Sequence, residues 1–315
     1  MERSLQKKIR LAGCAILVAV CLLPACGQSA HPNEHKRAAI SVPLYPTRQS
    51  PSDLEITVTT PGAAANSVRY ITYSDLNSLP QTTATIKDDP DFPGQTMQVT
   101  GVYLDVLAHA IGAPPASDLI DALCTDHYRS HFPASYIAAH HPILVLKIDG
   151  MTSDKWAARV HHEDPGPYFI THAHFVPTSH VLSHVEQPQV PYNVVRLNFT
   201  TTALTFGAIA PRGNFPVESP VQQGFAIAKQ NCLRCHFQGP YGGTKSGLDW
   251  TVLSTFAREQ PAFFSSYVHD PKSIQPHAQM PANPEYDAST LSALTAYFRT
   301  FAGDGDTTKS DHRSN

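Results

Sequence analysis

The chain has 315 residues, of which 42% are hydrophobic, and this is enough material for two globular cores. Its formal net charge is −3 at pH 7, so the composition gives no basic footprint and nucleic acid is excluded as an expected partner. The 27 prolines favour strands and loops with stiff connections over a helical bundle.

The first 25 residues have the pattern of an export signal. A basic segment precedes an apolar run at positions 11–23, which has the length of a signal peptide and is short for a membrane-spanning helix. Residues 23–26, Leu-Pro-Ala-Cys, resemble the lipobox of bacterial lipoproteins, in which the cysteine becomes the acylated first residue.

That resemblance implies that residues 1–25 are a lipoprotein signal peptide and that Cys26 carries the lipid. The mature protein is then expected to be exported to the periplasm and anchored to a membrane through its N-terminal lipid. Gly27 is not the aspartate that resembles an inner-membrane retention signal, so the outer membrane is preferred for a Gram-negative host. A plain secretory signal cleaved nearby is the alternative.

The rest of the chain divides by composition. Residues 26–52 are polar and proline-dotted, which predicts a flexible tether. Residues 53–205 carry runs rich in Val, Ile, Thr and aromatic residues, which predict an α+β domain, mainly β with short helices. Strands are expected over 54–60, 96–104, 143–148, 168–176 and 193–199, and helices over 72–79 and 103–112. A linker is expected over 206–219, a helical domain over 220–303 and a disordered tail over 304–315.

The strongest motif is Cys-x-x-Cys-His, formed by Cys232, Cys235 and His236. Two thiols at this spacing can both reach the vinyl groups on one edge of a haem, and the adjoining histidine then lies beneath the iron. A zinc site would need two more soft ligands at matching spacing, and only Cys124 remains. A redox disulfide would follow a strand, whereas the residues before Cys232 predict a helix running into the motif.

Residues 220–303 resemble the class I cytochrome c family. Gly224 lies eight residues before Cys232, where that family has a glycine for close crossing by its last helix, and Met280-Pro281 resembles its methionine loop. The resemblance implies an all-α fold, one covalent haem c and axial iron ligands His236 and Met280. His269 and His277 flank the methionine and are the competing sixth ligands.

A second resemblance covers about residues 54–202. The segments 71–86, 99–113, 125–137, 143–150, 166–176 and 192–200 resemble, in the same order, the molybdopterin-binding domain of the sulfite oxidase family. In that family a cysteine thiolate before the second of these segments binds molybdenum, and the corresponding run here, 83–98, contains no cysteine. The fold is therefore expected without its metal chemistry, and neither molybdenum cofactor nor another metal is expected. Cys124 is expected to be an inert buried thiol.

Ten of the 17 histidines lie between residues 127 and 184. His172 and His174 are expected to share a strand face, and His180 and His184 could share a helical face. Neutral imidazoles suit copper or zinc, so a bound metal is the alternative to a solvated or core role for these residues.

The sequence thus predicts an exported monohaem c-type cytochrome that carries one electron at a time. Its upstream domain would dock a redox partner protein. The alternative is a haem-linked periplasmic oxidoreductase whose upstream domain binds molybdenum cofactor or another metal. A third hypothesis is a haem-based sensor, which would need an open sixth position on the iron.

Overall fold

The computed structural model describes residues 41–59, 68–87, 89 and 92–301. The predicted signal peptide, the lipidation site Cys26 and the predicted tail over 304–315 lie outside these ranges. Within them, the chain forms a mixed α/β lobe, here called the β lobe (residues 41–205), followed by the helical lobe (residues 206–301). Among the described helices, none has the length and apolar character needed to cross a membrane.

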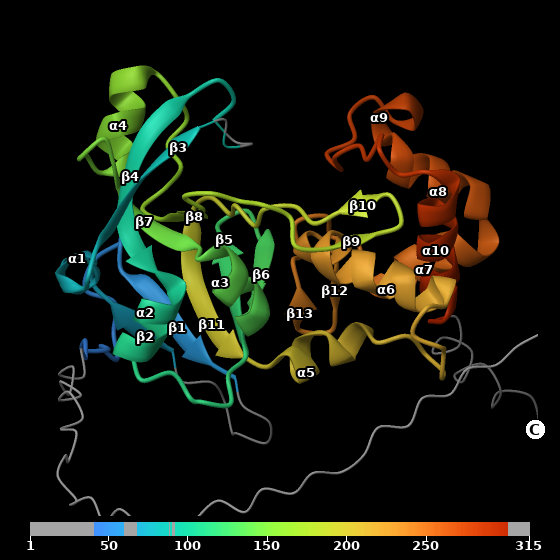
Figure 1. Cartoon of the computed structure of the whole chain (residues 1–315), viewed down its shortest axis with the longest axis horizontal. Coiled ribbons are helices and arrows are strands. Elements are labelled where there is room, and N and C mark those ends of the chain that lie inside the picture. The colour runs from blue at the N-terminus through green and yellow to red at the C-terminus, as the bar shows by residue number, and fades with distance from the viewer. Residues whose placement is uncertain (1–40, 60–67, 88, 90–91, 302–315) are drawn as a thin grey trace, which may run out of the picture. The chain divides into compact units, whose positions relative to one another are not determined.

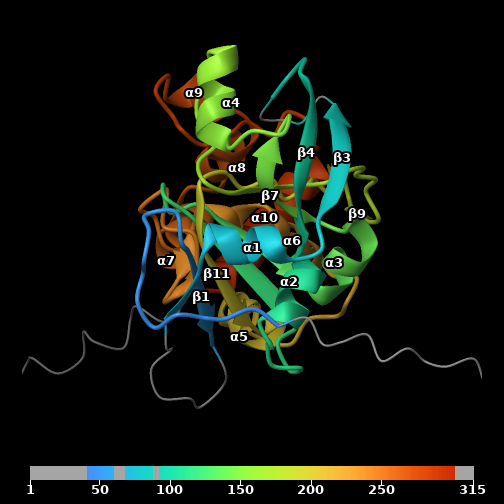
Figure 2. The same ribbon diagram turned by 90° about the vertical axis from the view of Figure 1, so that its left-hand side faces the viewer.

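The β lobe contains two sheets (Figures 1 and 2). The larger has the order β2-β1-β11-β5-β6, in which β1 and β11 are parallel and the other neighbours are antiparallel. Its strands are β1 (Leu54–Val58), β2 (Arg69–Ile71), β5 (Leu119–Cys124), β6 (Arg129–Pro133) and β11 (Val194–Thr200). The smaller sheet is antiparallel with the order β3-β4-β7-β8, comprising β3 (Thr82–Lys87), β4 (Thr96–Tyr103), β7 (Ile143–Ile148) and β8 (Phe169–Thr171).

Short helices supply the apolar side chains that complete the cores of these sheets. Helix α2 (Leu104–Ala110) buries Leu104 and Leu107 in the cluster that contains β1, β5 and β11 residues, while α4 (Ser153–Val160) buries Trp156 against β7. The remaining helices of this lobe are α1 (Tyr73–Ser78), α3 (Ala134–His140) and α5 (Thr202–Thr205), and a small hairpin is formed by β9 (His180–Val181) and β10 (His184–Val185).

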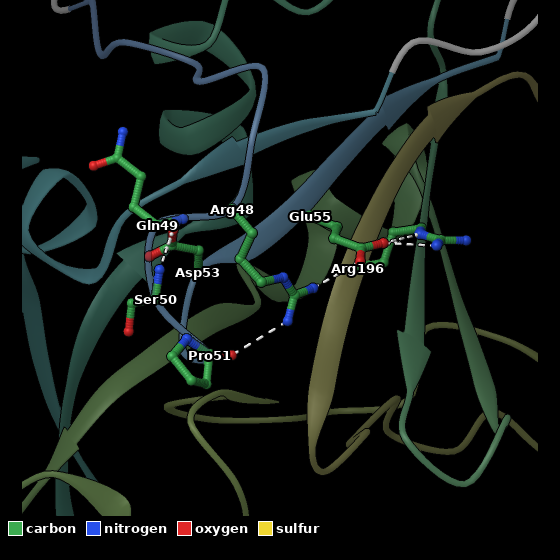
Figure 3. Close-up of polar contacts among 7 residues, drawn as sticks. All are labelled: Arg48, Gln49, Ser50, Pro51, Asp53, Glu55 and Arg196. Carbon is green, nitrogen blue, oxygen red and sulfur yellow. Dashed lines mark hydrogen bonds and ion pairs between the residues drawn. The ribbon is translucent and has the colours of Figure 1, made fainter.

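The described end of the predicted tether, from residue 41, lies against the β lobe. The backbone N–H of Val42 donates to the carbonyl of Ala110, and Tyr45 pairs with Tyr70 in an antiparallel bridge. Figure 3 shows how the following turn is held, with the Asp53 carboxylate accepting hydrogen bonds from two backbone N–H groups, those of residues 49 and 50. In the same view Glu55 of β1 is paired with Arg48 at 2.7 Å and with Arg196 of β11 at 2.6 Å. Residues 41–52 are thus packed on the lobe, because these bonds anchor them.

The helical lobe contains α6 (Pro220–Gln230), α7 (Trp250–Glu259), α8 (Pro261–His269), α9 (Pro271–Ile274) and α10 (Ala288–Arg299), with 3₁₀ turns η1 (Gly207–Ile209) and η2 (Cys232–Arg234). Side-chain caps begin four of these helices: the Ser219 hydroxyl accepts from the N–H of residue 222, and the Asp249, Asp270 and Asp287 carboxylates do the same for α7, α9 and α10. The lobe is not purely helical, because β12 (Phe237–Gln238) and β13 (Tyr241–Gly242) form a short antiparallel hairpin after the cysteine motif. Its core packs α6, α7, α8 and α10 around Trp250, Tyr297 and Phe298.

Candidate functional site

The cysteine motif lies where α6 ends in a 3₁₀ turn. The N–H groups of Cys235 and His236 both donate to the carbonyl of Cys232, at 3.2 and 3.0 Å, so the backbone turns tightly around the motif. Both cysteines are half-buried, and within the described part of the chain they are not joined in a disulfide. Burial raises the pKa of the Cys232 thiol to about 12 and also raises that of Cys235. A thiol–disulfide catalyst needs the opposite shift, because its nucleophile is a thiolate.

His236 is oriented by its Nδ1 atom. This nitrogen lies 3.0 Å from the carbonyl oxygen of Leu248 and 2.9 Å from the hydroxyl of Ser246. Because a carbonyl can only accept, Nδ1 carries the proton and Nε2 keeps the lone pair that binds a metal. Burial lowers the pKa of His236, an effect opposed by the hydrogen bond to Leu248, and so favours the neutral imidazole. The protonation and orientation of His236 therefore fit a role as a ligand of a haem iron through Nε2.

Met280 lies in the loop of residues 275–287 that joins α9 to α10, here called the methionine loop. Its half-buried side chain packs on the same hydrophobic cluster as Cys232, so the fold brings both candidate haem contacts to one core. A cavity of about 340 Å³ opens at the loop, and its lining residues are Lys272, Pro276, His277, Ala278, Gln279, Met280, Pro281 and Ala282. Of the two competing histidines, His277 is exposed at this cavity and His269 ends α8.

Arg234, between the two cysteines, places a buried positive charge at the motif. Only 9% of the residue is exposed, and its Nε donates to the carbonyl of Gln230 at 2.6 Å. Its Nη2 atom is buried without a hydrogen-bond partner among the described residues. In the described part of the chain no carboxylate forms an ion pair with it, and a buried guanidinium without such a partner favours any nearby group that gains negative charge. Sequence reasoning missed this residue, because its position between the cysteines carries no pattern of its own.

The β lobe contacts the motif directly. The Nε2 atom of His131, whose Nδ1 is 2.7 Å from Asp121, lies 3.4 Å from the carbonyl oxygen of Leu233. Nearby, the N–H of Thr244 donates to the carbonyl of His127. An exposed ion pair joins Lys245 to Asp126 at 2.6 Å, but solvent screening makes it a weak link. The backbone between the cysteines is therefore covered by β6 and the turn before it.

The histidine-rich region does not form the arrangement that the sequence predicts. Strand β8 ends at Thr171, so His172 is buried while His174 is exposed, and the expected shared strand face is wrong. His180 and His184 lie on the two strands of the β9–β10 hairpin, so the possible helical face is also wrong. Among the described residues, no three His, Cys, Asp or Glu side chains gather as a metal-binding group.

Five residues of this part of the chain instead form a polar cluster, in which all but Glu186 are buried. The hydroxyl of Tyr136 lies 3.0 Å from Nε2 of His172 and accepts from the N–H of Gln189 at 2.8 Å, while His140 lies 3.3 Å from Glu186. Burial lowers the pKa of His172 to about 4, with a smaller contribution from the charge of His140. The cluster borders a cavity of about 290 Å³ lined from both lobes by His131, Pro133, Ser135, Tyr136, Thr178, Ser179, Glu186, Gln189, Phe206, Ala226, Lys229 and Gln230. Cys124 is buried in the core of the larger sheet.

Comparison with known proteins adds little to this geometry. No protein-family description matches the sequence, and no curated protein matches it. Among solved structures, the sulfane dehydrogenase SoxCD from Paracoccus pantotrophus is similar at 18% sequence identity and a TM-score of 0.32. That match covers 49% of this chain and 40% of the other, so it spans less than half of either protein. A similarity of this size defines no family, and the function rests on the site itself.

Proposed function

We propose that the helical lobe is a class I cytochrome c domain that carries one covalent haem c and transfers single electrons to or from a redox partner protein. The observation that carries the proposal is the orientation of His236. Within a Cys-x-x-Cys-His motif, its Nδ1–H is directed at the Leu248 carbonyl, and this leaves Nε2 as the ligand atom.

The residues of the motif have separate roles in this proposal. Cys232 and Cys235 hold the haem as thioethers, and His236 supplies a neutral, oriented nitrogen below it. Met280 supplies a soft thioether as the sixth ligand, which favours the ferrous state and raises the potential. A bound haem would supply reversible one-electron chemistry, and with His236 and Met280 as its ligands it would leave no site for a substrate.

The remaining parts of the proposal concern the location and the β lobe. The protein is exported, its lipid at Cys26 anchors it to the membrane, and the outer membrane is preferred for a Gram-negative host. The β lobe has a sulfite oxidase-like fold that has lost the metal-binding cysteine, and it docks or orients the redox partner. Its direct contacts with the cysteine motif support this role, because a partner on the β lobe would lie beside the haem segment.

The metal content of the full chain, matured in a host that attaches c-type haem, tests the proposal. We expect one iron per chain, retained on denaturation because the haem is covalent, and no stoichiometric second metal. His236→Ala should lose the low-spin spectrum, whereas the matched control His277→Ala should keep it. A wild-type chain without covalent iron would overturn the proposal.

A second function is favoured by the 290 Å³ cavity, which is lined by both lobes and bordered by buried Tyr136 and Gln189. In this alternative the β lobe binds molybdenum cofactor or another metal, converts a small substrate and passes electrons to the haem within the chain. Stoichiometric molybdenum, copper or zinc beside the iron would favour it over the carrier function.

A further inference from the structure

A chain of hydrogen bonds crosses from the β lobe to both haem-binding segments of the helical lobe. It starts at His184 on β10, which is 1% exposed. Its Nδ1 lies 2.7 Å from the hydroxyl of Tyr286 in the methionine loop, and its Nε2 lies 3.2 Å from Oε1 of Gln230 at the end of α6. One side chain of the β lobe therefore contacts both the methionine loop and the end of the helix that leads into the cysteine motif.

The chain continues inside the helical lobe through Asn231, which directly precedes Cys232. The Nδ2 amide group of Asn231 donates one hydrogen bond to the Tyr286 hydroxyl at 2.9 Å and another to Oδ1 of Asn283 at 3.0 Å. Asn283 lies three residues after Met280 and is itself fixed to the end of α8, through its Nδ2 to Val268 and its N–H to the carbonyl of His269. The methionine loop is thereby joined to the cysteine motif by side chains alone.

The donors and acceptors of this chain agree at every step. Oε1 of Gln230 can only accept, so Nε2 of His184 carries the proton and donates to it. In the neutral ring Nδ1 is then an acceptor, and the Tyr286 hydroxyl, which accepts from Asn231, donates to Nδ1. His184, Tyr286 and Asn283 are all buried, and a buried network with each member satisfied fixes its geometry more strongly than separate bonds do.

We propose that His184 is a positioning residue for Met280, through which the β lobe holds the methionine loop against the cysteine motif and so sets the haem potential. The inference rests on the proposed haem site and assigns the β lobe a role in it besides partner docking. With His184 removed, Tyr286 loses its acceptor, and the loop keeps a link to the β lobe only at its last residue, where Asp287 bonds Ser183. Met280 then leaves the iron more often, and a less populated thioether ligand favours the ferric state.

The test uses the full-length holoprotein with His184→Ala and Tyr286→Phe, the second of which removes only the hydroxyl. In both variants we expect iron to stay at one per chain. We also expect a weaker far-red charge-transfer band of methionine-ligated ferric haem, a several-fold tighter binding of added imidazole, and a lower midpoint potential. These readouts report the ligand itself and would not move if His184 only stabilised the fold.

Ser183→Ala is the matched control. Ser183 lies beside His184 on the same hairpin, but it bonds Thr290 of α10 and Asp287, the last residue of the methionine loop and the cap of α10, and it does not join the chain to Asn231. We expect this variant to keep the wild-type band and potential. Unchanged band and potential in His184→Ala and Tyr286→Phe would overturn the inference, and so would an equal effect of Ser183→Ala. An iron-free wild-type chain would instead overturn the proposed function, so the two failures are distinguishable.

Discussion

Gly224 on α6 lies directly against Ala293 on α10. A β-carbon at position 224 would overlap the carbonyl oxygen of Ala293 and would fall 2.7 Å from Cβ of Tyr297. The close helix crossing that the sequence predicts at this glycine is confirmed, because only hydrogen fits between the two backbones. The crossing joins the helix that leads into the cysteine motif to the helix that follows the methionine loop.

Gly224→Ala should therefore destabilise the helical lobe. The obstacle is backbone rather than a flexible side chain, so the helices must separate, at a cost of about 1–3 kcal/mol. Urea unfolding of the holoprotein measures it. Gly207→Ala is the control, since a β-carbon there meets no atom within 4 Å. Equal stability of the two variants would contradict the crossing.

Arg234→Gln should lower the midpoint potential of the proposed haem. The buried guanidinium opposes the extra positive charge of ferric iron, and unit charges about 10 Å apart at an effective dielectric constant of about 20 interact by roughly 1.7 kcal/mol. Protein-film or mediated voltammetry measures the shift. Arg258→Gln, which removes an exposed guanidinium paired with Glu259, should leave the potential unchanged. A potential that rises in Arg234→Gln would refute this electrostatic role.

Asp287→Asn should flatten the acid limb of the stability profile. Hydrogen bonds from the N–H of Thr290 and the hydroxyl of Ser289 lower the pKa of Asp287 from 3.8 to about 2. A carboxyl whose pKa is lowered by folding stabilises the native state above its unfolded pKa, and this contribution is lost as the pH falls from about 4 to about 2. Asparagine still caps α10 but does not titrate. Thermal unfolding of the wild type and of Asp287→Asn at pH 6, 4 and 3 tests this prediction. If the melting temperatures of the two proteins fell in parallel with pH, the effect would be excluded.

Tyr136→Phe should destabilise the β lobe by about 1–3 kcal/mol, because it leaves the buried N–H of Gln189 and a ring nitrogen of His172 without their partner. Tyr103→Phe, at a half-buried residue whose hydroxyl accepts from Thr82, serves as the control with a smaller expected loss. Chemical denaturation of both variants gives the comparison. If Tyr136→Phe left the free energy of unfolding unchanged, the predicted loss would be refuted, and a water molecule would be taking the place of the hydroxyl.

The elements with local signals could be predicted from the sequence. Helix α10 follows its capping aspartate, α2 lies within the predicted 103–112, and β4 and β7 match their alternating or apolar runs. Helices α3 and α4 were not predicted, because each ends at a histidine in the left-handed conformation, His141 and His161, rather than at the usual glycine. The sequence patterns do not predict strands β5 and β6 either. They also do not identify Thr72 as the residue that caps α1.

The residues of the candidate site also fall into two groups, those that a sequence motif identifies and those that only the fold brings together. Cys232, Cys235 and His236 are adjacent in the chain, so a motif reveals them. The partner of His236, the Leu248 carbonyl, is a backbone group that no residue type identifies. His184 and Tyr286 are 102 residues apart, and their contact exists only because a hairpin of one lobe reaches the other. Such pairings depend on tertiary packing, which periodicity and spacing do not encode.

The covering of the cysteine motif by the β lobe implies an order of biogenesis. His131 lies over the Leu233 carbonyl, and Gly243 lies so close to the β lobe that a β-carbon there would fall 3.0 Å from the carbonyl oxygen of His127. On the proposed function, the enzyme that forms the two thioether bonds must reach this backbone before the lobes dock. If the chain is exported as proposed, the β lobe, which precedes the motif, would emerge first, and its closure on an unmodified motif would compete with haem attachment.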